Sequence, residues 1–429
     1  MRNNLTRSPY DPDSETGYNV WINESLDYNV VADAMLEDYY GLDKWFKPEV
    51  NLKLNIKPIP GLNYQQVIGY ENRQWELHQY WPSTHRSEID NSRKGHAHLA
   101  FSKTENLTSE GYFSYVKDFK GGHNLNATAG YSYFEVNGEN FGMDNYNFSV
   151  DGIKYWDIGQ GSYLTDGKAG MSSGKSVTER LFSFFARANY SYQDKYMLSA
   201  SIRHEGSSKF AADNRWANFW SATAGWRISN EEFMKDFDWL DDLKIRFGYG
   251  VTGNNDFSAT YMANMLGSDT NWMMPNGTWA YSYGKSQNVN PNLGWEEKKE
   301  WNLGVDYSFF EGRLYGKFDY YRRKVDNLLF SVKVPQPPYT QGSQMQNIGS
   351  MESKGWEFEV GGDIIRTKDF TWSSSMNLSH NTGKILTLEG DNSYHNGNGF
   401  VAPGTPGDAA RMEAGSTIGS FYMWKFAGF

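Results

Sequence analysis

The alternation of hydrophobic and polar residues is the main structural signal in this sequence. From about Thr178 onward, apolar residues recur at every second position, with polar or charged residues between them. A period of two places alternate side chains on opposite faces of an extended strand. In the first such run one face carries Tyr196, Leu198, Ala200 and Ile202, and the other carries Ser199, Ser201 and Arg203.

The same alternation recurs later in the chain and predicts strands at 220–228, 243–251, 303–309 and 356–364. Before Thr178 it is less regular, and we expect strands at 49–57, 62–71, 108–117 and 123–135. The pattern amounts to about 13 strands, an odd number, whereas bacterial single-chain membrane barrels close with an even number.

The connections between these strands fall into two classes. Short ones lie near 58–61, 118–122, 193–195, 311–312 and 366–369, and they alternate with long ones near 72–107, 136–178, 253–297, 328–352 and 382–415. Outer-membrane barrels have tight periplasmic turns and long extracellular loops. Two connections depart from this pattern, because the one near 229–241 is of medium length with room for a short helix, and the one near 206–215 is short.

A soluble β-sandwich or propeller would show the same alternation, because its apolar faces point into a core. Three observations favour a membrane barrel instead. The strands exceed the usual length of about 5 to 6 residues, aromatic residues gather at strand ends, and charges repeat on the polar face. The sequence predicts interfacial aromatic rings at Tyr190, Tyr192, Tyr196, Trp220 and Trp226. It predicts lumen-facing cations at Arg187, Arg203, Arg227, Lys244 and Arg246.

Amino-acid composition further limits the classes of protein to which this chain can belong. Aromatic residues make up 17% of the chain, while the mean hydropathy is only -0.70, as expected for strands with one polar face. The net charge is -10 and no basic block occurs, which gives nucleic-acid binding little support. The absence of cysteine excludes disulfides and thiolate metal sites. No uncharged apolar stretch approaches the roughly 20 residues of a membrane helix, and the first residues do not open a signal peptide.

Several segments after Thr178 resemble the SusC/RagA-type TonB-dependent transporters of Bacteroidetes. Arg203-His-Glu-Gly-Ser-Ser-Lys-Phe210 is similar to the family's R-x-D-G-S-S-x-F loop, with Glu205 in place of the usual Asp. Asn218 to Phe233 is similar to F-P-S-x-x-x-G-W-R-I-S-x-E-x-F, with Trp220 in place of Pro. The further matching segments, in the family's order, are Leu243–Asn254, Asn290–Glu296, Gly304–Asp306 and Asn347–Glu357.

This resemblance implies an all-β, antiparallel transmembrane β-barrel in the bacterial outer membrane. Family members also have a signal peptide, a TonB-contacting segment and an N-terminal plug domain, none of which is visible here. We therefore expect an incomplete barrel, about 13 of roughly 22 strands. We expect residues 1–48 to be an extracellular loop segment and 49–429 a partial barrel. Phe429 is either a truncation point or a true carboxy-terminal aromatic residue.

The resemblance further implies import of oligosaccharides or peptides, a SusD-like lipoprotein lid, and energy supplied by TonB through the plug. Independently, the loops carry flat rings that could stack on sugars. The candidate substrate contacts are Tyr155, Trp156, Trp272, Trp279, Tyr281 and Tyr283. For any one of these rings, packing against other loop residues or the lid is the more common role.

Other constellations offer weaker chemistry. His96 and His98 would share a strand face, but two ligands without a third favour ordinary surface or lumen histidines over a metal site. Asp151-Gly152 and Asp391-Asn392 could contribute to structural Ca²⁺ sites in loops, although neither has EF-hand spacing. The paired acids and the absence of a G-x-S-x-G motif give an enzyme no support, and no cofactor is expected.

The alternatives left open are a passive or structural outer-membrane barrel, such as a porin or adhesin, and a secreted soluble glycan-binding β-protein. An upstream plug domain would distinguish an active transporter from the first. Recovery from outer-membrane extracts would eliminate the second.

Overall fold

A computed structural model describes residues 8–19, 29–263, 266–388, 394–397, 410–421 and 427–428. The chain divides into two compact units. Unit 1 comprises Met1–Glu49, Gly69–Thr108 and Glu135–Thr178, and unit 2 comprises Val50–Ile68, Ser109–Phe134 and Glu179–Phe429. Among the described residues, no helix is long and apolar enough to cross a membrane.

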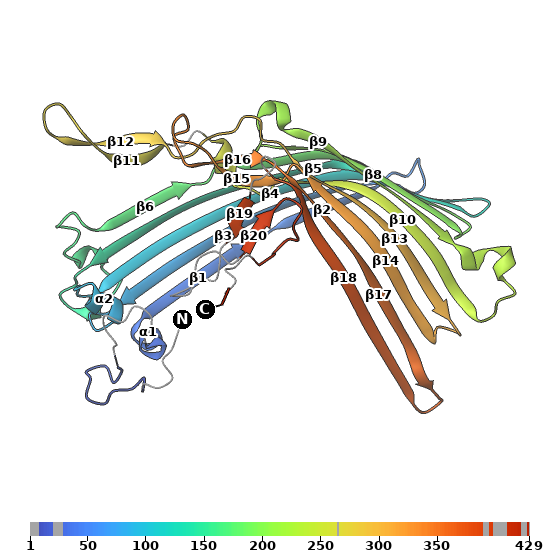
Figure 1. The fold of residues 1–429 in the computed structure, drawn as a ribbon, viewed down its shortest axis with the longest axis horizontal. Helices are drawn as coiled ribbons and strands as arrows, with labels where there is room; N and C mark the ends of the chain where they lie inside the picture. The colour runs from blue at the N-terminus through green and yellow to red at the C-terminus, as the bar shows by residue number, and fades with distance from the viewer. Residues whose placement is uncertain are drawn as a thin grey trace. The chain divides into compact units, whose positions relative to one another are not determined.

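One antiparallel sheet of 14 strands dominates the fold (Figure 1), in the order β1-β3-β4-β5-β7-β8-β9-β10-β13-β14-β17-β18, with β2 paired to β3 and β6 to β5. The first strands of this sheet are β1 (Asp38–Phe46), β2 (Glu49–Asn55), β3 (Leu62–Trp81), β4 (His96–Phe119), β5 (His123–Tyr146) and β6 (Gly170–Lys175). The later ones are β7 (Glu179–Tyr192), β8 (Tyr196–Ser207), β9 (Trp216–Arg227), β10 (Leu240–Asn254), β13 (Glu296–Phe309), β14 (Leu314–Asp326), β17 (Ser350–Arg366) and β18 (Thr371–Thr387). The all-β, antiparallel prediction is therefore confirmed.

Three separate two-stranded sheets belong to the connections. They are β11 (Leu266–Met273) with β12 (Trp279–Lys285), β15 (Leu329–Lys333) with β16 (Ser343–Asn347), and β19 (Tyr394–Gly397) with β20 (Ala410–Glu413). In the described part of the chain the helices are short: α1 (Val30–Leu36), α2 (Arg86–Asp90) and six 3-10 turns. Two of these turns, η4 (Ile228–Asn230) and η5 (Glu232–Met234), lie between β9 and β10.

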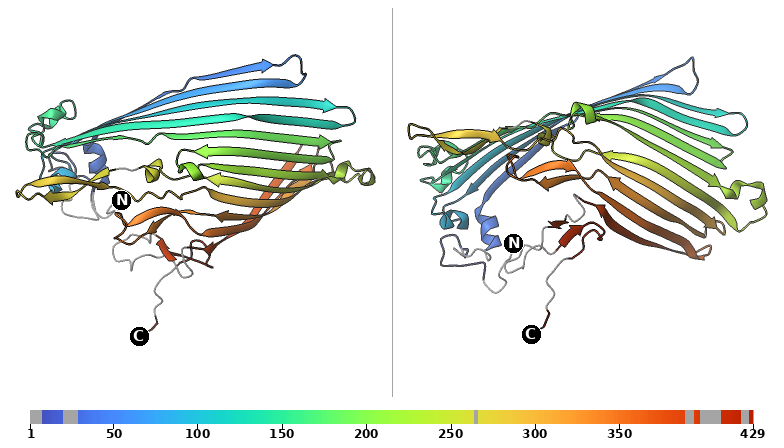
Figure 2. Two further views of the ribbon diagram at one scale, coloured as in Figure 1. Left: turned by 90° about the horizontal axis from the view of Figure 1, so that it is seen from above. Right: turned by 45° about the horizontal axis from the view of Figure 1, so that its top comes forward.

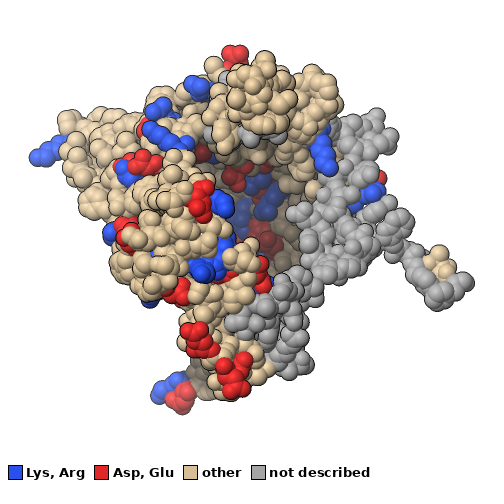
Figure 3. Space-filling model, turned by 90° about the vertical axis from the view of Figure 1, so that its left-hand side faces the viewer, with Lys and Arg blue, Asp and Glu red and all other residues tan. Residues whose placement is uncertain are grey.

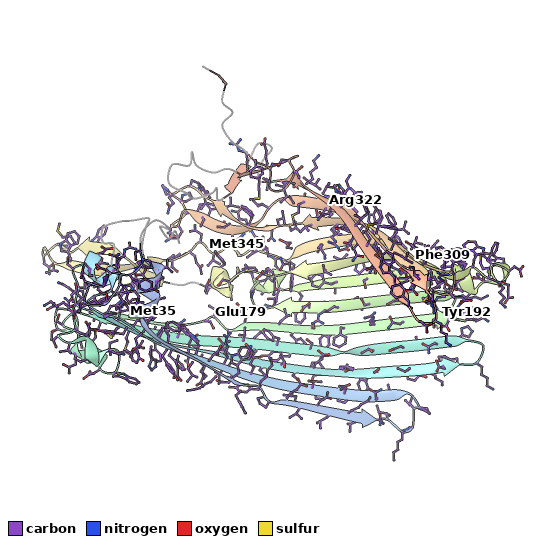
Figure 4. All side chains as sticks on the ribbon, turned by 90° about the horizontal axis from the view of Figure 1, so that it is seen from below. Met35, Glu179, Tyr192, Phe309, Arg322 and Met345 are labelled. Carbon is purple, nitrogen blue, oxygen red and sulfur yellow. The ribbon has the colours of Figure 1, made fainter. Side chains whose placement is uncertain are left out.

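The tight connections appear where the sequence predicts them, at 56–61, 120–122, 193–195, 310–313 and 367–370. In unit 2 these define the turn end of the strands, and the opposite end is the loop end; Figure 2 shows consecutive strands running in opposite directions between them. Gln193 and Asp194 adopt φ values of 51° and 53°, the left-handed conformation that tight hairpins require. Figure 4 places Tyr192 and Phe309 at the turn end.

Several sequence predictions need correction. The strands predicted at 62–71, 108–117 and 123–135 are much longer, so the connections predicted at 72–107 and 136–178 shrink to 82–95 and 147–178, the latter including β6. Residues Asp38–Phe46, predicted to lie in a loop segment, form β1, paired with Asn72–Tyr80 of β3. These segments are mixed in polarity and lack clean alternation, which is why the pattern missed them.

The length of β4 has a direct meaning. A strand of 24 residues extends about 79 Å, whereas a transmembrane strand needs only about 9 to 11 residues. More than half of this strand must therefore lie outside any hydrocarbon layer.

Candidate functional site

The two faces of the strands in unit 2 differ in chemistry. On β8, the exposed residues Leu198 and Ile202 alternate with the more buried Ser199, Ser201 and Arg203. Register carries this division across the sheet, because Ser201 lies opposite both Arg187 of β7 and Ser221 of β9. We call the two surfaces the apolar face and the polar face. All five predicted lumen cations lie on the polar face.

Two of these cations, Lys244 and Arg246, form one ion-pair cluster on the polar face. The Asp306 carboxylate of β13 accepts hydrogen bonds from Lys244 Nζ, at 2.7 Å, and from Arg246 Nη2, at 2.8 Å. Arg246 also reaches Asp319 of β14, at 3.3 Å. Gly304 lies opposite both Arg246 and Asp319, and a Cβ there would stand 2.7 Å from each of their side chains. The glycine therefore leaves the space in which the two charges meet.

The other three predicted cations each have a partner outside this cluster. Arg227 Nε lies 3.1 Å from Asp242, Arg203 bonds to Glu205 at 3.0 Å, and Arg187 donates to Asn189 at 3.3 Å. Beside Lys244 and Arg246 lies a hollow of about 430 Å³. Its lining combines small or polar residues, such as Ser199 and Thr223, with the apolar Met197, Leu198 and Phe247. Figure 3 shows basic and acidic side chains interspersed over the visible surface rather than separated by sign.

The apolar face carries two rows of aromatic residues. Near the turn end, Tyr196 lies opposite Trp226, and Phe309 ends β13. Near the loop end, ring centroids lie 5.2 Å apart for Trp220 and Tyr249, and the row continues through Trp301, Tyr320 and Trp356. Trp301 and Phe309 are eight residue steps apart on β13, about 26 Å of extended strand. This is of the order of the roughly 25 Å apolar band between the aromatic girdles of outer-membrane barrels.

The turn between β9 and β10 is fastened by one carboxylate. Glu231 accepts hydrogen bonds from Tyr196 Oη at 2.7 Å, Lys195 Nζ at 3.0 Å and Trp226 Nε1 at 3.1 Å. These donors, that of Tyr196 foremost, lower the pKa of Glu231 to about 2. The G-W-R-I-S-N-E-E segment is thus a turn clamp, and Glu231 has the partners of a structural group rather than of a hydrolase carboxylate.

At the loop end, distant segments pack into a buried cluster that we call the loop platform: Phe210, Phe219, Val251, Phe257, Leu293 and Trp295. Leu293 is fully buried, and Trp295 Nε1 donates to the carbonyl oxygen of Arg215 at 3.0 Å. The Asn347 side chain accepts from the amide of Gly294 at 2.7 Å and donates to its carbonyl at 2.8 Å. Three of the segments that carry the family resemblance therefore meet at the loop platform. They are Arg203–Phe210, Asn290–Glu296 and Asn347–Glu357.

The hairpin β11–β12 carries four of the six predicted substrate-contacting rings. Trp272, Trp279, Tyr281 and Tyr283 are all strongly exposed, at 66–75%. On β12, Trp279, Tyr281 and Tyr283 alternate along one face, whereas Trp272 lies opposite Ala280 and so belongs to the other face. Three rings therefore form a row on one face of the hairpin, and Trp272 lies alone on the other. Sequence spacing alone did not reveal this division.

The other two predicted rings lie in unit 1 and have different surroundings. Tyr155 is buried in a cluster with Tyr80, Ala97 and Phe148, while its neighbour Trp156 is 76% exposed. Asp151 accepts hydrogen bonds from Tyr80 Oη and Ser83 Oγ, each at 2.7 Å. Burial, assisted by this bond, raises the pKa of Tyr80. Both Asp151 oxygens thus already have protein donors, and Asp391-Asn392 lies outside the described residues.

The two histidines share one strand face as predicted, and they share one partner. His96 Nε2 and His98 Nδ1 each lie 2.8 Å from the same oxygen of Asp144. The His96 ring is stacked between Trp81 and Tyr146, at centroid distances of 4.5 and 4.1 Å. Burial lowers the pKa of His96. Among the described residues, no group of three potential ligands is arranged to hold a metal ion.

Comparison with known proteins decides the family. The family described as "TonB dependent receptor-like, beta-barrel" matches residues 2–428. The chain belongs to this family of TonB-dependent receptor barrels. TonB-dependent receptor P39 of Formosa agariphila is 31% identical over 388 residues, 87% of this chain and 34% of the relative. TonB-dependent receptor SusC of Bacteroides thetaiotaomicron is 37% identical over 267 residues, 61% of this chain and 26% of the relative.

Among solved structures, the RagAB peptide transporter matches with a TM-score of 0.79 and 24% identity, covering 92% of this chain and 41% of that chain. The SusC/RagA-type resemblance is thereby confirmed, as is the outer-membrane location that TonB-dependent receptors share. This location eliminates the secreted soluble alternative, and the family is one of transporters rather than enzymes. The chain spans 34% of the length of receptor P39 and 26% of the length of SusC.

Sequence reasoning missed the loop platform as a unit. Its members are scattered from Phe210 to Trp295, and alternation does not group them, because Phe219 and Val251 lie within strands whereas the other four lie in connections. The available signal was the set of family-like segments, because those at 203–210, 290–296 and 347–357 converge on this platform.

Proposed function

We propose that this chain forms part of the wall and outer loops of a transporter that imports oligosaccharides with a SusD-like surface lipoprotein over its loop end. The row of exposed rings on β12 carries the proposal, because flat aromatic faces bind the apolar faces of sugar rings. Trp279, Tyr281 and Tyr283 repeat about every 7 Å along the strand, so they offer a series of stacking positions rather than one.

The polar face supports the path of such a substrate. Hydroxyl-rich molecules require hydrogen-bond partners once they leave water, and this face offers Asn189, Ser199, Thr223 and Asn302 beside the Lys244, Arg246 and Asp306 cluster. We assign the polar face to the lumen and the apolar face to lipid. Residues 1–48 would then belong to the extracellular side, and TonB would supply energy through a plug domain elsewhere in the full-length protein.

A lipoprotein lid is supported by the hairpin itself. A two-stranded sheet is at best marginally stable alone in water, and β11–β12 exposes large rings on both faces. Large exposed apolar patches on soluble surfaces usually mark binding sites. One face of the hairpin would meet the substrate, and the other, with Trp272, would meet the lid.

The test is uptake of labelled oligosaccharides by cells carrying the full-length transporter. Trp279→Ala with Tyr281→Ala should reduce uptake at least about tenfold, since stacking on each ring contributes roughly 1 kcal/mol. Trp272→Ala is the matched control. It removes an equally exposed indole from the opposite face of the hairpin and should leave substrate binding unchanged. Unchanged uptake in the double variant would overturn the proposal.

Three further measurements separate the alternatives. Competition by peptides but not by sugars would assign the transporter to peptides. Uptake that persists after the proton-motive force is collapsed would identify a passive barrel. If the Trp272 face of the hairpin meets the lid, Trp272→Ala should bind sugar normally but should no longer co-purify with the lipoprotein.

A further inference from the structure

A group of cations occupies the apolar side of the wall near the loop end. We call it the outer basic patch: Lys299 of β13, Arg322 and Lys324 of β14, Lys354 of β17 and Lys384 of β18. Register places them in two rows. Trp301, Arg322, Lys354 and Thr382 form the first, and Lys299, Lys324, Glu352 and Lys384 form the second. Figure 4 shows Arg322 on its strand, away from the turn end marked by Phe309.

The patch lies directly beyond the aromatic row. Tyr320, Trp356 and His380 are aligned across β14, β17 and β18, and the first cation row begins two residues further along each strand. Two residues span about 7 Å. Because aromatic girdles mark the membrane interface, the cations stand at the depth of lipid headgroups on the side of the long loops.

Without a bound anion, repulsion between the cations of the patch destabilises the folded wall. Arg322 lies directly opposite Lys354, and Lys299 directly opposite Lys324. Like charges facing each other across strands are destabilising. Glu352 bonds to Arg322 at 2.5 Å, Asp326 to Lys324 at 2.8 Å, and Glu297 to Lys299 at 3.3 Å.

These three carboxylates balance three of the five cations in the patch, so two positive charges remain. In the part of the chain that the structure describes, no carboxylate forms an ion pair with Lys354 or Lys384, and both side chains are exposed. The surplus is positive in a chain whose net charge is -10. At the turn end the same face ends instead in apolar residues, the half-buried Phe309 and the exposed Leu314 and Trp372. The five cations of the patch therefore lie together at the loop end of the apolar face.

We propose that the outer basic patch binds the phosphorylated headgroup of an outer-leaflet lipid, such as the phosphates of lipid A. The patch is on the face assigned to lipid, so its ligand approaches in the plane of the membrane rather than through the lumen. Phosphate oxygens would separate the opposed cations, and the Trp301 and Trp356 rings below would contact the upper part of the acyl chains. This inference rests on the assignment of the apolar face to lipid, but not on the identity of the substrate.

The experiment uses the full-length transporter in nanodiscs of phosphatidylcholine, with or without bis-phosphorylated lipid A. Native mass spectrometry counts bound lipid A, and titration gives its apparent affinity. In Lys354→Gln with Lys384→Gln, which orphans no carboxylate, we expect about 30-fold weaker binding, the loss for two interfacial charges. Lys354→Arg with Lys384→Arg should bind as the wild type does.

Lys368→Gln is the matched control, an exposed lysine in the turn at the opposite end of the same β17–β18 hairpin. It should retain full affinity. Wild-type affinity in the double glutamine variant, or equal loss in Lys368→Gln, would overturn the proposal. So would competition by millimolar inorganic phosphate alone, because a free anion would then suffice. Should the double variant not fold, Lys384→Gln alone should still weaken binding. Oligosaccharide uptake is a separate readout, so failure of one proposal leaves the other testable.

Discussion

Arg246 on β10 lies 3.3 Å from Asp319 on β14, although β13 runs between these two strands. The contact exists because the intervening position is Gly304, where a side chain would occupy the space used by both groups. The family-like Gly304-Val-Asp306 segment is thereby explained. Its glycine opens the route across the strand, and its aspartate holds both Lys244 and Arg246.

We expect Gly304→Val to separate Arg246 from Asp319 and to lower the free energy of unfolding by about 1 kcal/mol, the scale of a partly exposed ion pair. Urea unfolding in detergent micelles measures the change. The control is a cycle with Asp319→Asn, because the two substitutions should not add if both remove the same interaction. Full additivity would contradict this explanation of the glycine.

Leu293→Ala should loosen the loop platform. The side chain is fully buried, and such truncations cost about 2 to 5 kcal/mol. Because the platform joins the connections at 255–295 and 327–349, the expected result is faster amide exchange and proteolysis in both, with the strands unchanged. Leu266→Ala, in the same connection but 70% exposed, should have no such effect.

Glu231 should make the turn clamp sensitive to acid. Its folded pKa of about 2 is below its usual value of about 4.5, so its stabilising contribution is complete above about pH 4.5 and is lost as the pH falls toward 2. Thermal unfolding between pH 2 and 7 should show this acid limb in the wild type and a weaker one in Glu231→Gln. Glu232→Gln is the control, since Glu232 bonds only to Lys235 within the same turn. An unaltered acid limb in Glu231→Gln would contradict the clamp.

His96 should give unit 1 a second pH dependence. Burial lowers its folded pKa below about 6.5, so the unfolded state binds a proton more readily and local stability falls as the pH drops through that value. Amide protection at 81–96 and 144–163, measured relative to the intrinsic exchange rate at each pH, should fall between pH 7.5 and 5.5. His96→Phe keeps a ring between Trp81 and Tyr146 and should flatten this dependence. An equal loss of protection in His96→Phe would assign the effect to another group.

The sequence predicts the later strands well because each has one apolar and one polar face, as β8 shows from Tyr196 to Arg203. It predicts all five tight turns for the same reason, since alternation stops there. It fails on β1 and on the outer halves of β3, β4 and β5, where residues such as Asn72, Gln74 and Glu76 form hydrogen bonds with other polar side chains. Where neither face meets lipid, a strand has no reason to alternate.

The candidate site was predicted unevenly. Placement of Arg187, Arg203, Arg227, Lys244 and Arg246 on one face follows from their parity and from the pairing of their strands. The separation of Trp272 from Trp279 depends on the register of β11 with β12, which spacing does not specify. The burial of Tyr155 depends on residues as distant as Tyr80, so no local pattern could have revealed it. Whether these rings and cations contact substrate stays a prediction.

The continuous register from β13 to β18 also limits how this protein can change its length. Deleting one residue between Leu314 and Asp326 would turn Phe318 and Tyr320 to the polar face and move Lys317 and Asp319 to the lipid side. Every neighbouring pair would lose its match at once. Insertions and deletions should therefore be tolerated in the wall only in steps of two residues, while the connections at the loop end accept any number. Evolution of new specificities would then be confined to the outer surface, with the wall inherited almost unaltered in length.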